Sequence, residues 1–572
     1  MYILGISAYY HDSAVCVLRD GEIIAAAEEE RFSRIKHDSG FPGRAARYCL
    51  RAAGIGIDRV DLVSFYDKPF LKLERLLETS IGFSPKGASF FAKATGSFVK
   101  DKIWIREAIR KELGYSGRVL FFEHHLSHAA SAFFASPFCR AAFLTVDGVG
   151  EWATTSYGTG RENKVEIFRE LHFPHSLGLL YSAFTQYLGF KVNSGEYKVM
   201  GLAPYGRPRY VRKIFAELID LKKDGSFRLN MDYFGYGTGF TMINRKFEEF
   251  FGGRGRESET EISQKQMDIA RSIQEVTNEV MLRLARQVKR ETREKNLCLA
   301  GGVALNCVAN SVILKQGIFD NLWIQPAAGD AGGSLGAAYL AYCHYKDGEL
   351  PLKTGLLEQG SDLQKGSLLG PEYSNQEIEC FLKKRKVKYR FLEFEELFDF
   401  SARAISQGKV IGWFQGRMEF GPRALGSRSI IADARRPEMR EKLNRMIKFR
   451  ESFRPFAPAV LKEKTGDWFL LNGESPYMLF VVDVLEKRRS VIPAVTHTDY
   501  SARVQTVDRK SNPLFYGLIE AFYGQTGYPV IVNTSFNVRN EPIVRTPGQA
   551  YECFKKTSMD LLVIGNFVVE KK

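Results

Sequence analysis

The sequence lacks any apolar run long enough to cross a membrane and any recognisable export signal. A spanning helix needs about 20 consecutive apolar residues, and no stretch of the 572 residues reaches that length. The opening MYILGISAYYHDSA has neither the basic region nor the small-residue cleavage site of a signal peptide, and it is typical of a strand. We therefore expect a cytoplasmic protein with no membrane contact.

Cysteine is scarce and ungrouped. The eight cysteines include no C-x-x-C pair, which excludes a zinc ribbon and a thioredoxin-type redox motif. We expect free thiols in a reducing compartment. Low-complexity tracts are also missing, and 45% hydrophobic with 26% charged residues is the balance of a folded globular protein. The length then suggests two to four domains.

Positive charge is in excess and is concentrated. The formal net charge is +15, and residues 401–460 hold 13 Lys or Arg residues against five Asp or Glu residues. These arginines lie among Gly, Pro and Phe, in QGRMEFGPRALGSRS and KFRESFRPFAP. A nucleic-acid surface more often shows lysine runs with interleaved aromatics. We therefore favour a phosphate-binding pocket, where the guanidinium fork matters, over a general polyanion surface.

A pattern of strand, polar loop, strand, turn and strand occurs twice, about 135 residues apart, and predicts an internal duplication. The predicted strands are Tyr2–Ser7, Ala14–Leu18 and Glu22–Ala27, then Ala141–Val146, Thr154–Tyr157 and Lys164–Leu171. Two related α/β halves normally bind a ligand in the cleft between them.

The chain divides into three predicted parts. Residues 1–345 form the duplicated domain, and 346–375 form a linker because this text is polar, rich in Gly, Lys and Leu, and aperiodic. Helix and strand patterns alternate again over 376–572, which predicts a separate α/β domain. The fold class is therefore α/β in both domains.

Three of the nine histidines lie in FFEHHLSHAASAFF. His124 and His128 are four residues apart, which places both imidazoles on one face of a helix, a spacing used by metal sites. Asp147, at a strand end, and Asp330, in a glycine-rich turn, could complete a site for Fe(II), Mn(II) or Zn(II). A histidine cluster without metal stays open as the alternative.

Two further features are weaker as bare patterns. Gly301 and Gly302 in AGGVALN follow a strand and could approach a nucleotide, or could only form a tight turn. His11 beside Asp12 is a candidate general base, and Lys36 is an exposed lysine unless a site uses it.

The second domain carries a set of candidate ligand contacts. Asn533, at the end of a strand, offers a hydrogen-bonding group where open α/β sheets bind ligands. The basic candidates for phosphate contact are Arg423, Arg428, Lys448, Arg454 and Arg503. For any single arginine the alternative is a surface salt bridge.

Ten motifs cover nearly the whole chain in one order. They are HDSA at 11–14, AEEERFSRIKH at 27–37, HHLSHAASAFF at 124–134, VDGVGE at 146–151, KVMGLAPYG at 198–206, GGVALN at 301–306, GPRALGSRS at 421–429, FRPFAP at 453–458, ARVQTV at 502–507 and NTSFN at 533–537. With these motifs the chain resembles the O-carbamoyltransferases of antibiotic tailoring and nodulation-factor biosynthesis.

The resemblance implies an N-terminal domain similar to the threonylcarbamoyl-transferase fold, a duplicated actin/sugar-kinase architecture, and a C-terminal domain similar to threonylcarbamoyl-adenylate synthase. It implies that the C-terminal site forms carbamoyl-adenylate from carbamoyl phosphate and ATP with Mg. The N-terminal site would then transfer the carbamoyl group to a hydroxyl of a small-molecule acceptor.

The resemblance also implies roles for particular residues. A divalent transition metal, typically iron, would be held by residues matching His124, His128, Asp147 and Asp330. A catalytic base matches His11. The adenylate and acceptor side would include Asp12, Lys36, Gly148, Gly301, Gly302 and Asn306.

Two alternative functions remain. The sequence also leaves open whether the chain forms a homodimer. A fused enzyme forming threonylcarbamoyladenosine in tRNA would explain the net charge of +15, although the text of FRPFAP and GPRALG fits the small-molecule transferases better. A non-catalytic nucleotide-binding regulator would need neither a metal dyad nor a second anion-binding cage.

Overall fold

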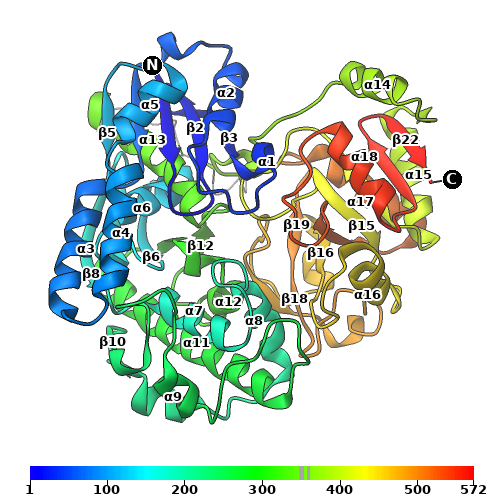
Figure 1. Ribbon diagram of the computed structural model, residues 1–572. Coiled ribbons are helices and arrows are strands. Elements are labelled where there is room, and N and C mark those ends of the chain that lie inside the picture. Colours follow the sequence, from blue (N-terminus) through cyan, green and yellow to red (C-terminus); the bar gives the residue numbers. More distant parts are fainter. Residues whose placement is uncertain (347–352, 354, 357–360, 572) are drawn as a thin grey trace. The chain divides into compact units, whose positions relative to one another are not determined.

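The computed structural model describes residues 1–571 except 347–352, 354 and 357–360 (Figure 1). The predicted linker 346–375 falls in part on these omitted residues and in that part lies outside the description. Two compact units are present: Met1–Ala25 with Ser39–Leu357, and Ala26–Asp38 with Glu358–Lys572. In the described part of the chain, no helix combines the length and hydrophobicity of a membrane-crossing segment.

The first unit contains two five-stranded sheets of the same topology. Their orders are β3-β2-β1-β4-β5 and β8-β7-β6-β11-β12, and in each the first strand pairs antiparallel with the second and parallel with the fourth. The strands are β1 (Tyr2–Ser7), β2 (Ala14–Arg19), β3 (Glu22–Glu28), β4 (Leu62–Phe65), β5 (Val119–Phe121), β6 (Arg140–Val146), β7 (Ala153–Arg161), β8 (Lys164–His172), β11 (Asn296–Ala300) and β12 (Asn321–Ile324). The predicted duplication is confirmed by this repeated topology.

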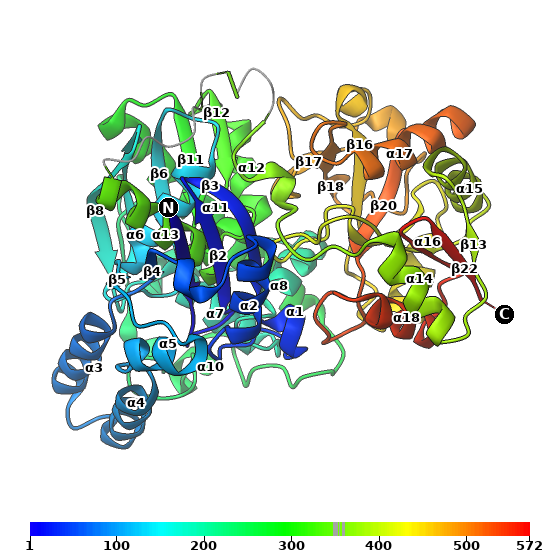
Figure 2. The same ribbon diagram turned by 90° about the horizontal axis from the view of Figure 1, so that it is seen from above.

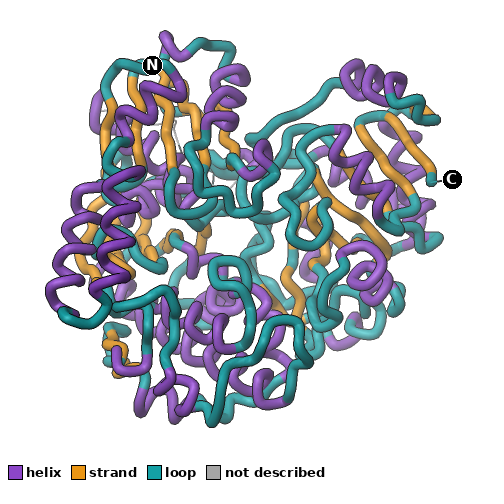
Figure 3. The backbone as a smooth tube through the Cα atoms, viewed as in Figure 1, coloured by secondary structure: helices purple, strands orange, loops and turns teal. Residues whose placement is uncertain are grey.

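Two helices lie between the sheets. Helix α13 (Asp330–Lys346) packs against β1 and β2 on one side and against α6 (His124–Ala135) on the other, and α6 in turn packs against β6 and β11. Helices α2 (Gly43–Ala52) and α11 (Gln264–Thr292) cover β2 and β6, so helix and sheet layers alternate (Figure 3). Both central helices begin at the same end of the unit, because the side chains of their first residues approach to 3.8 Å.

The two halves differ in one crossover. Between β11 and β12 the chain forms α12 (Cys307–Lys315), whereas between β4 and β5 it forms α3 (Pro69–Phe83), α4 (Ala88–Asp101) and α5 (Ile105–Leu113). Helices α3 and α4 lie side by side as a hairpin (Figure 2). The segment between β8 and β11 adds α7 (Leu177–Tyr187), α8 (Glu196–Leu202), α9 (Val211–Glu217), β9 (Ile219–Leu221), β10 (Phe227–Leu229) and α10 (Arg245–Phe250).

The second unit is built on an eight-stranded sheet of order β13-β22-β21-β14-β15-β20-β16-β19. Helices α15 and α17 pack on it over a core that includes Trp413 and Phe515. The sheet strands are β13 (Arg390–Phe391), β14 (Ile411–Phe414), β15 (Arg428–Asp433), β16 (Ala457–Leu461), β19 (Gln505–Val507), β20 (Val530–Ser535), β21 (Leu561–Ile564) and β22 (Phe567–Glu570). The other elements are α1 (Glu30–Ser33), α14 (Asn375–Lys384), α15 (Phe394–Ser406), α16 (Met439–Lys442), β17 (Val481–Asp483), β18 (Ser501–Arg503), α17 (Pro513–Thr526) and α18 (Pro547–Lys556).

The expectation that residues 1–345 form one uninterrupted unit needs correction at Ala26–Asp38. This segment belongs to the second unit because it is hydrogen-bonded there. The Glu28 carboxylate accepts from the Gly421 N–H at 2.7 Å, and Arg31 donates to the Gly421 carbonyl at 2.9 Å. Arg34 donates to two further carbonyls of the unit, those of residues 542 and 543.

The close packing of α13 on α6 predicts that a methyl group added at Gly336 lowers the stability of the first unit. A Cβ at Gly336 would lie 1.8 Å from the Ser127 carbonyl oxygen of α6, so the two helices can approach only with glycine there. We expect Gly336→Ala to lower the free energy of unfolding by about 1–3 kcal/mol, seen as a lower urea midpoint for this unit. Gly96→Ala in α4, where nothing lies within 4 Å, is the matched control. Equal midpoints for both variants would show that the helices are not in close contact.

Candidate functional site

Four buried ligand groups converge where α6, α13 and β6 meet. The Nε2 atoms of His124 and His128 are 3.1 Å apart. Asp147 Oδ2 lies 3.0 Å and 3.7 Å from these two nitrogens, and Asp330 Oδ1 lies 3.8 Å from each. The structure thus brings together the four residues that were predicted as a cluster, with one ligand atom from each inside a 4.8 Å span.

The positions of these groups follow from the fold. His124 is the first residue of α6, Asp330 is the first residue of α13, and Asp147 directly follows β6. His128 is one turn further along α6, which brings its ring beside that of His124, with centroids 4.6 Å apart. Because the end of a strand and the beginnings of two helices supply the four groups, with His128 one turn inside α6, rigid elements hold the cluster.

Neighbouring groups fix two of the ligands. The Gly302 N–H donates to Asp147 Oδ1 at 2.9 Å, so the predicted glycine turn contacts the cluster through its backbone. Gly301 has a φ of 86°, and a Cβ there would lie 2.3 Å from the Val146 carbonyl oxygen, so that position requires glycine. The Tyr66 hydroxyl donates to Asp330 Oδ2 at 3.2 Å.

Glu151 holds the start of α6. Its carboxylate is buried and accepts from the backbone N–H of His124 at 3.0 Å and from that of Lys68 at 2.8 Å. A carboxylate at a helix N-terminus is favoured both by the free N–H groups and by the helix dipole. Glu151 therefore positions the helix that carries both histidines.

The cluster has the donor set of a transition-metal site. Burial alone would raise the pKa of Asp147, but the hydrogen bond with His124 and the nearby His128 imidazole hold it well below its ordinary value, so this carboxylate is ionised. Two imidazole nitrogens that face each other cannot both donate, whereas both can ligate a cation as lone-pair donors. Two nitrogens and two carboxylate oxygens suit Fe(II), Mn(II) or Zn(II). The residues present therefore fit the metal that the resemblance implies.

His11 lies in the loop after β1 with its Nδ1 2.8 Å from Asp12 Oδ2. Burial would lower the pKa of His11, but the Asp12 hydrogen bond and the charges of Asp330, Asp12 and Asp147 raise it to about 10. A histidine with that pKa is an imidazolium at neutral pH and can donate but not accept a proton. His11 can therefore act as the predicted base only when positive charge nearby offsets the negative charge of these carboxylates.

Gly148 and Asn306, which were predicted on the adenylate and acceptor side, make hydrogen bonds within the first unit. The Gly148 carbonyl accepts from the Ser176 hydroxyl at 2.7 Å. The Asn306 side chain accepts from the Ala309 N–H at 3.1 Å as the cap of α12 and exchanges hydrogen bonds with the buried Gln274 amide. These contacts shape the loops around the cluster.

In the second unit, Lys448 ends a π-helical segment, Leu443–Lys448, and is buried. Its ammonium donates to the carbonyl of Ser535 at 2.7 Å and to the carbonyl and side-chain oxygens of Asn537 at 2.8 and 2.6 Å. A lysine thus fixes the NTSFN loop at the end of β20. π-Helical turns often mark functional positions.

Cations gather around Lys448. Burial first, and then the charges of Arg450, Arg454 and Lys36, hold the pKa of Lys448 well below its ordinary value. Lys36, expected on the first domain's side, thus acts within the second unit, in line with the placement of Ala26–Asp38. A group of mutually repelling cations gains free energy when a polyanion binds.

The GPRALG loop, which carries Arg423, is braced from two strands. The buried Asn533 amide donates to the Ala424 carbonyl at 3.2 Å and to Gln505 Oε1 at 2.7 Å. Arg503 is the last residue of β18, and like Arg423 it is half-buried. That Arg423 and Arg503 share a pocket with Lys448 stays a prediction.

The prediction that Arg428 contacts phosphate was wrong. Arg428 is fully buried and lies 3.7 Å above the ring centroid of Phe414. Its two terminal nitrogens donate to four main-chain carbonyl oxygens, those of Pro371, Gln415, Gly416 and Ser427. A guanidinium with its donors used in this way braces the fold.

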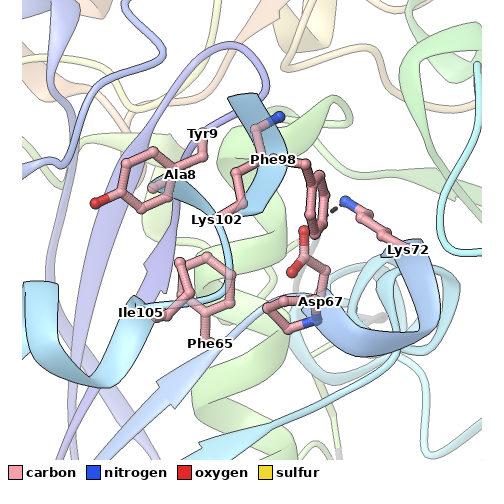
Figure 4. Close-up of a pocket in the computed structure, with 9 residues that line it drawn as sticks. Ala8, Tyr9, Phe65, Asp67, Lys72, Phe98, Lys102 and Ile105 are labelled. Atoms are coloured by element: carbon pink, nitrogen blue, oxygen red, sulfur yellow. Dashed lines mark hydrogen bonds and ion pairs between the residues drawn. The ribbon is translucent and has the colours of Figure 1, made fainter. Parts of the chain in front are cut away.

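A small pocket lies beside the first cluster and was missed from the sequence (Figure 4). Its walls include Phe65, Asp67, Lys72, Phe98 and Lys102. The sequence feature that could have indicated this pocket is the polar run YDK directly after β4. Because β4 pairs in parallel with β1, this run lies at the carboxyl end of a strand, where open α/β sheets bind ligands.

Comparison with known proteins identifies the family of the chain. The family model described as carbamoyltransferase N-terminus matches residues 2–339, and the one described as carbamoyltransferase C-terminus matches residues 402–571. The Synechocystis protein sll1178 is 53% identical over 600 residues, covering 100% of this chain and 97% of its own. Nodulation protein NolNO of Sinorhizobium fredii is 38% identical over 580 residues, covering 99% of this chain and 80% of its own.

Among solved structures, full-length HypF in the phosphate- and nucleotide-bound form overlaps 59% of this chain and 55% of its own, with a TM-score of 0.33 and 12% identity. That likeness is too remote to bear on function. The two family matches, with relatives aligned over nearly the full length, show that the chain belongs to the carbamoyltransferase family and is a carbamoyltransferase enzyme.

Proposed function

We propose that this carbamoyltransferase is ATP-dependent and modifies a hydroxyl group of a small molecule. The second unit would form carbamoyl-adenylate from carbamoyl phosphate and ATP with Mg, and the first unit would transfer the carbamoyl group. One observation carries the proposal: a single chain combines a buried cluster of two histidines and two aspartates with a separate group of cations around Lys448.

The cations of the second unit suit the first half-reaction. Carbamoyl phosphate and ATP are both polyanions, so one can approach the other only when their charges are neutralised. Lys36, Arg450 and Arg454 supply positive charge near Lys448, which in turn holds the NTSFN loop. Arg423, Arg503 and Asn533 are proposed as further contacts in this pocket.

The first unit suits the transfer. His124, His128, Asp147 and Asp330 would hold a divalent transition metal, for which iron is our proposal. When bound, such a cation supplies a Lewis acid for the carbamoyl carbonyl or the adenylate phosphate and offsets the carboxylate charge near His11. His11, oriented by Asp12, would then take the proton of the attacking hydroxyl.

Product mass tests the proposed function. The full chain is incubated with ATP, carbamoyl phosphate and a library of hydroxyl compounds, and we expect one product heavier than its parent by one carbamoyl group.

Arg454→Ala should abolish adenylate formation, because it removes one of the positive charges near Lys448, while added carbamoyl-adenylate is still used. Arg445→Ala, at an exposed residue of the same segment, is the control. ATP-independent transfer, or unchanged adenylation in Arg454→Ala, would contradict the proposal.

Metal content tests the ligand assignment. We expect His124→Ala/His128→Ala to lose the bound metal, because it removes both nitrogen ligands. The measurement is elemental analysis of purified protein after dialysis. His172→Ala is the control, since that histidine is exposed and pairs with Glu170. Wild-type metal content in the double variant would refute the assignment.

The role of His11 predicts two effects. His11→Asn should still form carbamoyl-adenylate but should transfer it about 10²–10⁴-fold more slowly, because asparagine cannot accept the hydroxyl proton. Asp12→Asn should lower the pKa of His11, measured by NMR titration, because the amide carries no negative charge to favour the imidazolium. Transfer by His11→Asn within a few-fold of wild type would reduce His11 to a residue that positions substrate.

A further inference from the structure

Two residues with left-handed backbone flank Tyr10 and His11 in the loop after β1. Tyr9 has a φ of 69° and Asp12 a φ of 52°. This conformation is uncommon for residues that carry a side chain, and strain of this kind often occurs at functional sites. Consecutive side chains of an extended strand point to opposite sides, whereas the rings of Tyr10 and His11 have their centroids only 5.1 Å apart. The loop therefore presents both side chains on one side.

The Tyr10 hydroxyl lies beside the cluster of two histidines and two aspartates. A Cβ built on Gly148, the residue directly after Asp147, would be 3.8 Å from the Tyr10 hydroxyl oxygen. Although Tyr10 as a whole is 39% exposed, its hydroxyl is close to buried carboxylates. Burial first, and then the charges of Asp147 and Asp330, raise the pKa of Tyr10 above its ordinary value. The same two aspartates act on the pKa of His11, so Tyr10 and His11 face one group of carboxylates.

Tyr10 offers a ligand a hydrogen-bond donor and not a base. An ordinary tyrosine has a pKa near 10, and the surroundings of Tyr10 raise this value further, so the hydroxyl keeps its proton at neutral pH. Within the described part of the chain, this hydroxyl forms no hydrogen bond. Its proton is therefore available to a molecule that binds beside the cluster.

Carbamoyl transfer needs a donor at one particular atom. When the acceptor hydroxyl attacks the carbamoyl carbon, a C–O bond forms and the hydroxyl proton passes to His11. The π electron pair of the carbonyl moves onto the carbonyl oxygen, and it returns as the bond to the phosphate oxygen breaks and AMP leaves. The carbonyl oxygen thus gains full negative charge only during the reaction. A hydrogen bond to it lowers the barrier more than it strengthens substrate binding.

We propose that Tyr10 is a catalytic residue of carbamoyl transfer, whose hydroxyl donates a hydrogen bond to the carbamoyl carbonyl oxygen as negative charge develops there. The inference rests on the proposed function, because it concerns the transfer step. His11 and Tyr10 then have complementary tasks, since the imidazole accepts the proton of the attacking hydroxyl and the phenol stabilises the charge on the attacked group. Their adjacent positions in one loop hold these two groups in a defined arrangement.

Removal of one hydroxyl tests this role. Transfer is measured with the full chain, added carbamoyl-adenylate and the library of hydroxyl compounds, with water as a second acceptor. We expect Tyr10→Phe to lower kcat for transfer about 10²–10³-fold, the effect of losing one oxyanion donor, while KM for adenylate and acceptor stays within about twofold. Adenylate formation from ATP and carbamoyl phosphate, metal content and the thermal midpoint should match wild type. Tyr345→Phe is the control, because Tyr345 is 36% exposed and lies at the opposite end of α13 from Asp330.

The kinetic parameters separate this role from the alternatives. A transfer kcat of Tyr10→Phe within a few-fold of wild type would overturn it. So would a raised KM with unchanged kcat, because the hydroxyl would then bind the adenylate or the acceptor equally in the ground state. Loss of metal or a lower thermal midpoint in Tyr10→Phe would make Tyr10 a structural residue instead. If wild type forms the adenylate but transfers to neither water nor any compound, the transfer step of the proposed function fails, and the role of Tyr10 fails with it.

Discussion

The close packing of α6 against α13 is the constraint on which the transfer unit depends. Each helix covers the inner face of a different sheet, and Gly336 lets their backbones approach. Because both helices begin at the same end, His124 and Asp330 meet as first residues, and Asp147 joins them from the end of β6. The two histidines of α6 are thus brought together with Asp147 and the distant Asp330 by the packing of the duplicated halves.

The two units differ in the sign of the charge that they bury. In the first, two carboxylates and two imidazoles are buried together, and the negative charge also raises the pKa of His11 to about 10. In the second, positive groups surround a buried lysine. Burying charges of one sign is costly unless an opposite charge joins them. The proposed cation in one unit and the proposed polyanion in the other would remove this cost, so each unit would gain stability from its ligand.

Part of this arrangement can be predicted from the sequence, and the reasons for the rest are physical. The His124 and His128 spacing reports helix geometry directly, and the repeated hairpin text predicts the duplication, because both are local patterns. The placement of Ala26–Asp38 depends on contacts with residues almost 400 positions away, as between Glu28 and Gly421. Arg428 and Arg454 have similar surroundings in sequence, and only burial separates a brace from a candidate ligand contact. Tyr66 and Lys102 carry no motif at all.

The duplication also separates the clustered histidine and aspartate side chains from the crossover in which the two halves differ. Residues of the cluster lie on elements that both halves share, so a change there would disturb sheet packing and chemistry together. Helices α3 and α4 replace one crossover and lie at the carboxyl end of β4, where a parallel strand presents side chains to a ligand. Lys72 and Phe98 of this hairpin line the pocket, and none of the described residues that line it belongs to α6 or α13. A carbamoyltransferase of this architecture can therefore vary in this hairpin while the four clustered histidine and aspartate side chains stay unchanged.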